Sequence, residues 1–378
     1  MNTTSFGEQR LARAYLVRVA EPPAPALTTF VAEHGPVDAA ARVAAGRVPI
    51  AVDNETNARR HLVDGAADLV TAAEHGARLV IPEDAEWPAW PLLCLELAQG
   101  HGRSHLAAPL GLWVQGTLNL DDGTARALAI VGARAATSYG EQYAADFGYE
   151  LARQGTTVCS GAAYGIDGGA HRGALAASGP TVAVLACGLD VGYPAGHVGL
   201  LNRVAEQGAV ISEYPPGTPP ARHRFLVRNR LIAALSAGVV VVEAGARSGA
   251  RNTAVTAGKL GKSVMAVPGA IGSAMSAGCH QMIRRGEAEL VTSVDEITET
   301  SGPLVAEQPA DPATTKRRPS DGLTPPAARV HDALTSRVSK PAEQVAAESG
   351  VPLREVRTTL PLLELDGMAR RDDCGWRC

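Results

Sequence analysis

The sequence has few aromatic residues and no excess of positive charge. Phe, Trp and Tyr make up 4% of its 378 residues, so its hydrophobic cores must consist mainly of Ala, Val and Leu. The 35 basic and 39 acidic residues give a net charge of −4. This balance excludes a uniformly basic nucleic-acid coat, but not a local basic site, because electrostatic contacts are local.

Paired cysteines, a signal peptide and long hydrophobic runs are also missing. The six cysteines form no Cys-x-x-Cys pair, so we expect no zinc ribbon and no metal site. Residues 1–20 contain Glu8, Arg10, Arg13 and Arg18 and lack the apolar core of a secretory signal. No run of 18 uncharged apolar residues is present, so no membrane partner is expected. Together these absences predict a cytoplasmic protein with reduced thiols.

The Gly-rich segment at residues 159–171, CSGAAYGIDGGAH, matches none of the common nucleotide or hydrolase motifs. It lacks the Lys and Ser/Thr of a P-loop, and it does not fit the dinucleotide pattern G-x-G-x-x-G. Without a G-x-S-x-G elbow, Ser160 and His171 do not indicate a hydrolase triad. We therefore expect no catalytic residue and no cofactor.

Residues 110–297 alternate short apolar segments with helical ones. The segments predicted as strands are LGLWVQG, ALAIVGA, TTVCSG, TVAVLAC, AVISEY, GVVVVEA and SVMAVPG. Apolar strands joined by helices indicate a parallel sheet that is covered on both faces. The predicted fold class is α/β, with a Rossmann-like parallel sheet core, a small helical N-terminal domain and a C-terminal winged-helix domain.

Two Gly-rich turns follow the first two core strands. A glycine at the carboxyl end of a strand lets a phosphate approach the backbone, and an arginine beside it adds a charged fork. The alternatives are a tight turn with a surface arginine, and a helix that Asp167 caps. The candidate phosphate-contacting residues in these turns are Gly132, Arg134, Ser160, Gly161 and Gly165.

Residues 221–262 hold eight basic residues and one acidic residue, Glu243. In the segment HRFLVRNRLI, three arginines and an asparagine surround Phe225, just before an apolar helix. Basic residues follow a nucleic-acid backbone, and an aromatic ring stacks on a base. The alternative is a solvated helix start whose arginines pair with carboxylates elsewhere. The candidate residues are Arg224, Phe225, Arg228, Asn229 and Arg230.

A third Gly/Ser turn follows the strand GVVVVEA, in the segment AGARSGARNTA. The carboxyl ends of parallel strands meet at one edge of a sheet, where ligands bind. The three turns and a basic hairpin around Phe225 therefore predict an extended phosphate-binding edge, with more positive charge than one nucleotide needs. The candidates added here are Ser248, Gly249 and Arg251.

The combined motifs resemble those of the DNA-processing protein A family (DprA, also called Smf). They are AIVGARAATSYG, SGAAYGIDGGAHRGAL, VLACGLDVGYP, ISEYPPGTPPARHRFLVRNRLIAALS, VVVVEAGARSG and AVPGAIGSAMSAGCHQMI. The resemblance implies a single-stranded-DNA-binding protein that is not an enzyme. It implies protection of incoming DNA, help in loading the RecA recombinase during natural transformation, and a homodimer formed through the Rossmann domain.

The resemblance also implies roles for single residues. Arg134 contacts phosphate, Phe225 stacks on a base, and Arg228, Asn229 and Arg230 form the R-N-R motif. Tyr164 stands where the family usually has a basic residue, so a phosphate contact is lost and a stacking surface is offered. The candidate DNA-binding set is Gly132, Arg134, Ser160, Gly161, Tyr164, Gly165, Arg224, Phe225, Arg228, Asn229, Arg230, Ser248, Gly249 and Arg251.

The domain organisation is predicted from composition and from the same resemblance. From Lys316 to the C-terminus, 11 basic residues stand against 9 acidic ones, so the last domain is as well suited to bind a protein as to read DNA. The predicted parts are a divergent helical domain (SAM or helix-hairpin-helix-like) over 1–62, a Rossmann-like DNA-binding core over 63–300 with core motifs at 105–297, a Pro-rich linker over 301–322 and a winged helix over 323–378.

One rival interpretation is a nucleotide-handling Rossmann enzyme of the lysine-decarboxylase-like phosphoribohydrolase type. Enzymes of that type have a P-G-G-x-G-T-x-x-E loop. The corresponding region here, AGARSGARNTA, has neither the Pro-Gly-Gly nor the downstream Glu. The sequence leaves open the DNA affinity, the dimer face, the RecA-contacting residues and whether the host takes up DNA.

Overall fold

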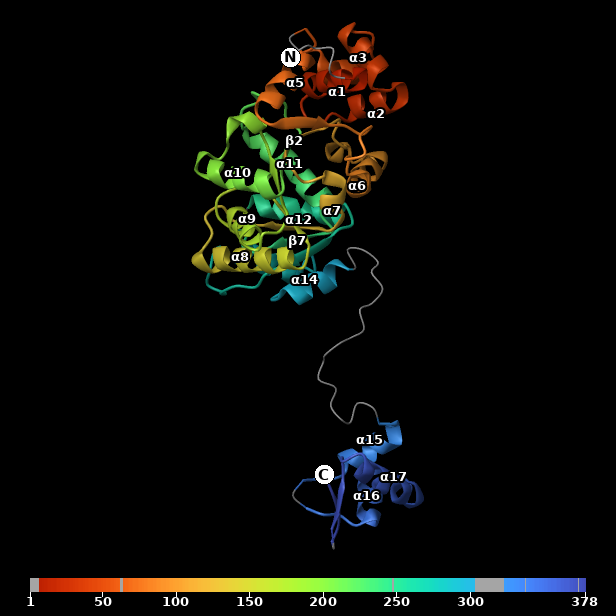
Figure 1. Cartoon of the computed structure of the whole chain (residues 1–378). Helices are drawn as coiled ribbons and strands as arrows, with labels where there is room; N and C mark the ends of the chain where they lie inside the picture. Colours follow the sequence, from red (N-terminus) through yellow and green to blue (C-terminus); the bar gives the residue numbers. More distant parts are fainter. Residues whose placement is uncertain (1–6, 62–63, 247, 303–322, 337, 373) are drawn as a thin grey trace. The chain divides into compact units, whose positions relative to one another are not determined.

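The computed structural model divides the chain into two compact units, residues 1–306 and 307–378 (Figure 1). It describes residues 7–61, 64–246, 248–302, 323–336, 338–372 and 374–378. All but the first two residues of the predicted linker lie outside this described part. The finer division of the first unit into residues 1–62 and 63–300 stays a prediction.

Five short helices open the first unit, and four of them lie within the predicted helical region 1–62. Two of them begin with a proline at their first position, where its missing N–H costs no hydrogen bond. Their core includes Leu16, Leu27 and Val43 and extends to Leu79 and Trp113 of the sheet. The five are α1 (Glu8–Val19), α2 (Pro25–His34), α3 (Pro36–Ala44), α4 (Ile50–Thr56) and α5 (Gly65–Glu74).

A nine-stranded sheet forms the centre of this unit, in the order β1-β2-β6-β5-β4-β3-β7-β8-β9. The chain runs from β3 outward through β4, β5 and β6, then crosses back to β7 on the other side of β3. The strand order therefore reverses between β3 and β7. The strands are β1 (Ala77–Val80), β2 (Leu112–Gly116), β3 (Ala127–Val131), β4 (Thr157–Ser160), β5 (Thr181–Leu185), β6 (Ala209–Ser212), β7 (Gly238–Val241), β8 (Ser263–Ala266) and β9 (Glu289–Leu290).

The Rossmann-like prediction is confirmed for β3 to β9, which are all parallel, but not for the segment LGLWVQG. This segment forms β2, which pairs antiparallel with β1 and with β6, where Trp113 lies opposite Ser212. Both faces of β2 are buried, Trp113 against the N-terminal helices and Leu112 and Val114 against the main core. Composition gave no warning, because a strand covered on both faces is apolar whichever way it runs.

Helices cover both faces of the sheet (Figure 1). Alternate residues of each strand supply the two cores, as Ala129 and Ile130 of β3 do. One face carries α6 (Ala89–Gly100), α7 (Leu120–Ala125), α11 (Arg222–Ala234), α12 (Gly249–Lys259) and α13 (Ala277–Arg284). The other carries α8 (Ser138–Arg153), α9 (Ile166–Ala176), α10 (Val198–Gln207) and α14 (Val294–Ser301).

The second unit is the predicted winged helix. Three helices pack around Val330, Val345 and Leu360, and Trp376 of a short hairpin closes this core. The elements are α15 (Pro325–Asp332), α16 (Ala342–Ser349), α17 (Leu353–Leu365), β10 (Arg370–Asp372) and β11 (Gly375–Arg377). No helix within the described part of the chain has both the length and the apolarity needed to cross a membrane.

Close packing of α8 against α9 depends on two glycines. A Cβ on Gly173 would lie 2.0 Å from the carbonyl oxygen of Ala145, and one on Gly148 would lie 2.4 Å from that of Ala170. Both clashes involve backbone, which cannot turn aside as a side chain does. These glycines set the spacing of the two helices that follow β3 and β4.

We expect Gly173→Ala to lower the free energy of unfolding by about 1–3 kcal/mol, the usual cost of overpacking a core. Gly258→Ala is the matched control, because this helical glycine has no neighbour within 4 Å of an added Cβ. The control is expected to stabilise by about 0.5–1 kcal/mol through helix propensity. Urea denaturation measures both, and equal effects would contradict the packing argument.

Candidate nucleic-acid interface

A groove of about 720 Å³ lies at the carboxyl edge of the sheet. It is bounded by the loops after β3 and β7 and by α11, at the point where the strand order reverses. Ligands of open α/β sheets bind at such a point. The structure brings seven of the candidate residues to the groove: Gly132, Arg134, Phe225, Arg228, Asn229, Ser248 and Gly249.

The basic segment around Phe225 is helical, so the expectation of a basic hairpin was wrong. Helix α11 begins at Arg222, and its periodicity places Arg222, Phe225 and Asn229 on the groove side. Arg224 and Arg230 do not line the groove. The helix therefore separates the arginines that a linear reading of the segment had grouped together.

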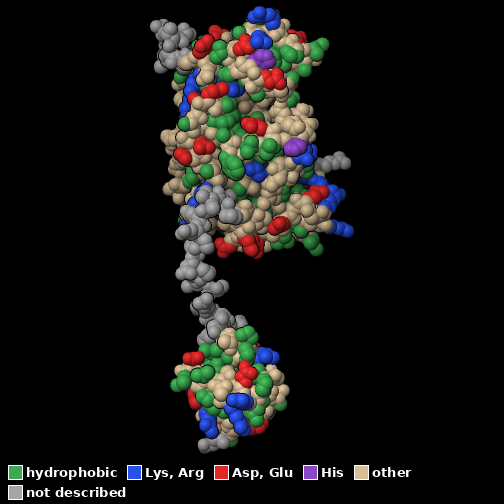
Figure 2. Space-filling model, turned by 90° about the vertical axis from the view of Figure 1, so that its right-hand side faces the viewer, with side chains coloured by type: hydrophobic (Ala, Val, Ile, Leu, Met, Phe, Trp, Pro, Cys, Tyr) green, Lys and Arg blue, Asp and Glu red, His purple; other side chains and the backbone are tan. Residues whose placement is uncertain are grey.

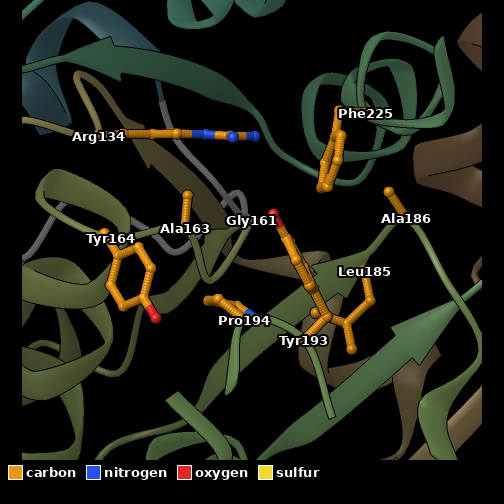
Figure 3. Close-up of a pocket in the computed structure, with 9 residues that line it drawn as sticks. All are labelled: Arg134, Gly161, Ala163, Tyr164, Leu185, Ala186, Tyr193, Pro194 and Phe225. Atoms are coloured by element: carbon orange, nitrogen blue, oxygen red, sulfur yellow. The ribbon is translucent and has the colours of Figure 1, made fainter. Parts of the chain in front are cut away.

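Phe225 lies between a cation and a second aromatic ring. The guanidinium carbon of Arg134 is 4.8 Å from the centroid of the Phe225 ring, and the Tyr193 ring is 5.5 Å from it at an angle of 45°. Figure 3 shows Arg134 reaching toward Phe225 from one side, with Tyr193 below. Arg134 is exposed and both rings are half-buried, so the cluster combines a positive charge with stacking surface.

Tyr193 was not among the sequence candidates. The only signal was its place in VLACGLDVGYP, one of the motifs that carry the resemblance. It follows β5, whose loop also reaches this edge of the sheet, because β5 is parallel to β4. An aromatic at the end of a further core strand was therefore a candidate for the same surface.

Tyr164 lines a hollow that adjoins the groove, together with Arg134 and Gly161 (Figure 3). Its side chain is 48% exposed. Its hydroxyl accepts a hydrogen bond from the Gly196 N–H at 3.1 Å. The centroids of the Tyr164 and His197 rings are 4.7 Å apart, and the two rings are arranged edge to face. Tyr164 is thus fixed at the site with an exposed aromatic surface.

Arg228 lines the groove but is only 5% exposed. Its guanidinium donates to the Val184 carbonyl and lies against Gly161, where a Cβ would be 2.0 Å from Nη1. Burial lowers the pKa of Arg228, and the nearby Asp167 carboxylate opposes this effect. Arg228 therefore supports the loop after β4 from within, and its guanidinium does not extend into the groove, where a DNA-binding residue would be expected to reach.

Asp167 joins two of the loops and does not act as the expected helix cap. Gly165 occupies the N-cap position of α9, and the Asp167 carboxylate accepts the Gly161 N–H at 3.1 Å. Burial raises the pKa of Asp167, opposed by Arg228 and by N–H groups that include that of Gly132. The carboxylate is thus hydrogen-bonded to the turn after β4 and lies close to the turn after β3.

Arg230 and Arg224 form ion pairs inside the first unit, which was the alternative interpretation of this segment. Arg230 is 2% exposed and donates to both Glu213 oxygens, at 2.7 and 2.8 Å, and to the Ala107 carbonyl at 3.0 Å. Arg224 donates to Glu21 at 2.7 and 3.1 Å. Neither presents a free guanidinium edge to the groove.

Ser160 and Gly165 shape the backbone behind the groove and do not line it. Ser160 is fully buried, and its hydroxyl donates to the Ile130 carbonyl at 2.6 Å, which ties β4 to β3. Gly165 has a φ of +74°, and a Cβ there would lie 2.3 Å from the Ala133 carbonyl oxygen. Both positions demand small residues for structural reasons.

The turn after β7 opens α12 beside the groove. The Ser248 hydroxyl accepts the Arg251 N–H at 3.4 Å, and Gly249 is exposed. The Arg251 side chain turns away, toward Gln281 at 3.3 Å and Glu287 at 3.4 Å. The turn thus presents backbone to the groove, without the Arg251 side chain that the sequence had suggested.

Glu243, the acidic residue that follows β7, is buried and hydrogen-bonded within the protein. Glu243 is 2% exposed, and its carboxylate accepts hydrogen bonds from the Thr137 N–H at 2.9 Å and the Thr137 hydroxyl at 2.6 Å. It serves to tie the turn after β7 to the start of α8. The geometry gives no support to the phosphoribohydrolase interpretation.

The accessible charge of the groove is positive. Arg134 and Arg222 are exposed, and no carboxylate among the described residues lies within 4.0 Å of either guanidinium. Figure 2 shows acidic and basic side chains interspersed on the face that it presents. Charge of one sign is therefore a local property of the groove, as the overall charge of −4 required.

Comparison with known proteins gives one consistent result. A family described as DNA recombination-mediator protein A matches residues 78–302, and one described as DprA winged helix domain matches residues 313–373. A putative DNA processing protein DprA from Mycobacterium tuberculosis is 47% identical over 367 residues, which cover 96% of this chain and 93% of that protein.

Two further relatives extend the comparison. Protein Smf of Escherichia coli is 42% identical over 246 residues, which cover 64% of each chain. An X-ray structure of DNA processing protein A from Streptococcus pneumoniae superposes with a TM-score of 0.61 and 29% identity, covering 77% of this chain and 97% of that one.

We expect Arg230→Met to lower the free energy of unfolding by about 3–5 kcal/mol, because it leaves the Glu213 carboxylate buried without its partner. Urea denaturation measures the loss. The matched control is Arg222→Met, an exposed position on the same helix, expected to change stability by about 0.5 kcal/mol or less. A stable Arg230→Met chain with weakened DNA binding would instead restore the surface role that the sequence suggested.

Proposed function

Because this chain belongs to the DNA-processing protein A family, also called Smf, we propose that it is a single-stranded-DNA-binding recombination mediator. The observation that carries the proposal is the cluster of Arg134, Phe225 and Tyr193 at the switch point of the sheet. A cation and partly exposed rings beside glycine-rich backbone suit a strand whose bases are unpaired.

The proposed binding mode follows from the groove. Backbone phosphates lie along Arg134, Arg222 and the turns at Gly132 and Gly249. A base stacks on Phe225, with Tyr193 and Tyr164 as neighbouring ring surfaces. Every DNA base has a π-face, so binding of this kind tolerates many sequences and depends strongly on salt.

The wider role is that of the family. We propose that the protein protects incoming single-stranded DNA and helps to load RecA onto it during natural transformation. We propose that it acts as a homodimer formed through the Rossmann domain. We also propose that it is cytoplasmic, as its proposed role with RecA requires. The description of the matching family as a recombination mediator supports this role. We assign the protein no catalytic step.

Replacement of Phe225 by Ala is expected to weaken binding of oligo-dT by about 5- to 150-fold, the equivalent of one base–aromatic stack of about 1–3 kcal/mol. Replacement of Arg134 by Ala removes one phosphate contact. It is expected to reduce the slope of log affinity against log salt by about 0.7. Fluorescence anisotropy with labelled oligo-dT and a matched duplex, across a salt series, measures both effects.

Arg153→Ala is the control for charge. Arg153 ends the 16-residue helix α8, and the helical rise places it about 24 Å from the start of that helix, toward the opposite edge of the sheet. Its loss is expected to leave affinity unchanged. Preference for duplex over oligo-dT, or equal losses in Arg134→Ala and Arg153→Ala, would contradict the proposed site.

A further inference from the structure

Helix α11, which carries Phe225, begins with an unfavourable charge pattern. Its first three residues are Arg222, His223 and Arg224, at the end of the helix that carries partial positive charge. The N-cap residue, Ala221, makes no side-chain cap, and the first turn contains no acidic residue. Apart from its backbone hydrogen bonds, the first turn of the helix therefore contains no group that offsets this positive charge.

The missing negative charge comes from a residue about 200 positions earlier. Glu21 lies between α1 and α2, and its Oε1 accepts a hydrogen bond from Arg224 Nε at 2.7 Å and lies 3.1 Å from His223 Nε2. Its Oε2 accepts from Arg224 Nη2 at 3.1 Å and from Arg59 Nη2 at 2.5 Å. Partial burial opposes ionisation, but these hydrogen bonds lower the pKa of Glu21 to about 2.

Arg224 links Glu21 to the first turn of α11. Its guanidinium also lies over the Tyr214 ring at 5.2 Å, and its side chain is only 12% exposed. Phe225 is the next residue of the same turn. The position of the ring that faces the groove thus depends on a carboxylate of the N-terminal helical region, although none of the described residues 7–61 lines the groove.

We propose that Glu21 is a positioning residue, whose carboxylate holds the first turn of α11 so that Arg222 and Phe225 remain directed into the groove. The proposal rests on the proposed function of that groove. It assigns the N-terminal helical region a part in DNA binding without DNA contact: the region braces the helix that makes the contact.

The test compares two glutamates of this region in the full-length chain, Glu21→Gln and Glu55→Gln. Glu55 is the matched control, because its carboxylate accepts hydrogen bonds from the N–H groups of Ala26 and Leu27 at the start of α2 and makes no hydrogen bond or ion pair with α11. Two readouts are taken. One is hydrogen–deuterium exchange of the amides of residues 224–228 without DNA, and the other is oligo-dT affinity.

Glu21→Gln is expected to speed exchange of these amides and to weaken oligo-dT binding about fivefold or more, the lower end of the loss of a base stack. Glu55→Gln is expected to do neither, even where it lowers the melting temperature. Glu21→Asp keeps the charge and is expected to restore most of the affinity.

Unchanged exchange in Glu21→Gln would overturn the brace, and faster exchange with unchanged affinity would overturn its role in binding. Failure of the wild-type chain to bind oligo-dT would instead refute the proposed function. In that case the exchange measurement would still decide whether Glu21 holds the helix.

Discussion

The groove at the carboxyl edge of the sheet depends on the interactions of one buried group, the carboxylate of Asp167. It accepts a hydrogen bond from the Gly161 N–H in the turn after β4. It also lies near the buried guanidinium of Arg228, which packs against Gly161 and donates to the Val184 carbonyl of β5. Charged groups in an apolar interior are costly unless they are matched. The edge of the sheet is therefore preorganised from within, so the exposed Arg134 and Arg222 and the aromatic rings of the proposed site are carried on a fixed backbone.

Strand positions, the layers and the winged helix could be predicted, because apolar segments at regular spacing report burial directly. The direction of β2 could not be predicted, because its apolar composition shows that both faces are covered and does not depend on which way the strand runs. Three of the predicted glycines, Gly132, Gly161 and Gly165, leave no room for a Cβ, whereas Gly249 has no neighbour within 4 Å of one. At Gly161 and Gly165, however, the group that approaches is a guanidinium or a carbonyl of the protein itself.

The partners of the arginines in residues 221–230 could not be predicted from the sequence. Arg134 and Phe225 lie together at the groove, whereas Arg224, Arg228 and Arg230 are used inside the protein. Their partners or neighbours lie far away in sequence or on other strands, as Glu21 and Glu213 do. The charge of residues 221–262 alone includes one acidic residue, Glu243, and leaves out Glu21 and Glu213. It therefore overstates the free positive charge of the segment.

The N-terminal helices have a consequence for solubility as well as for position. They cover Leu79 of β1, the strand at one end of the sheet, and Trp113 beside it. A sheet edge with exposed apolar faces is a template for pairing with other chains. A chain shortened by these helices would expose the apolar face of β1 and β2 that they cover, so the N-terminal helices also shield that face from association with other molecules.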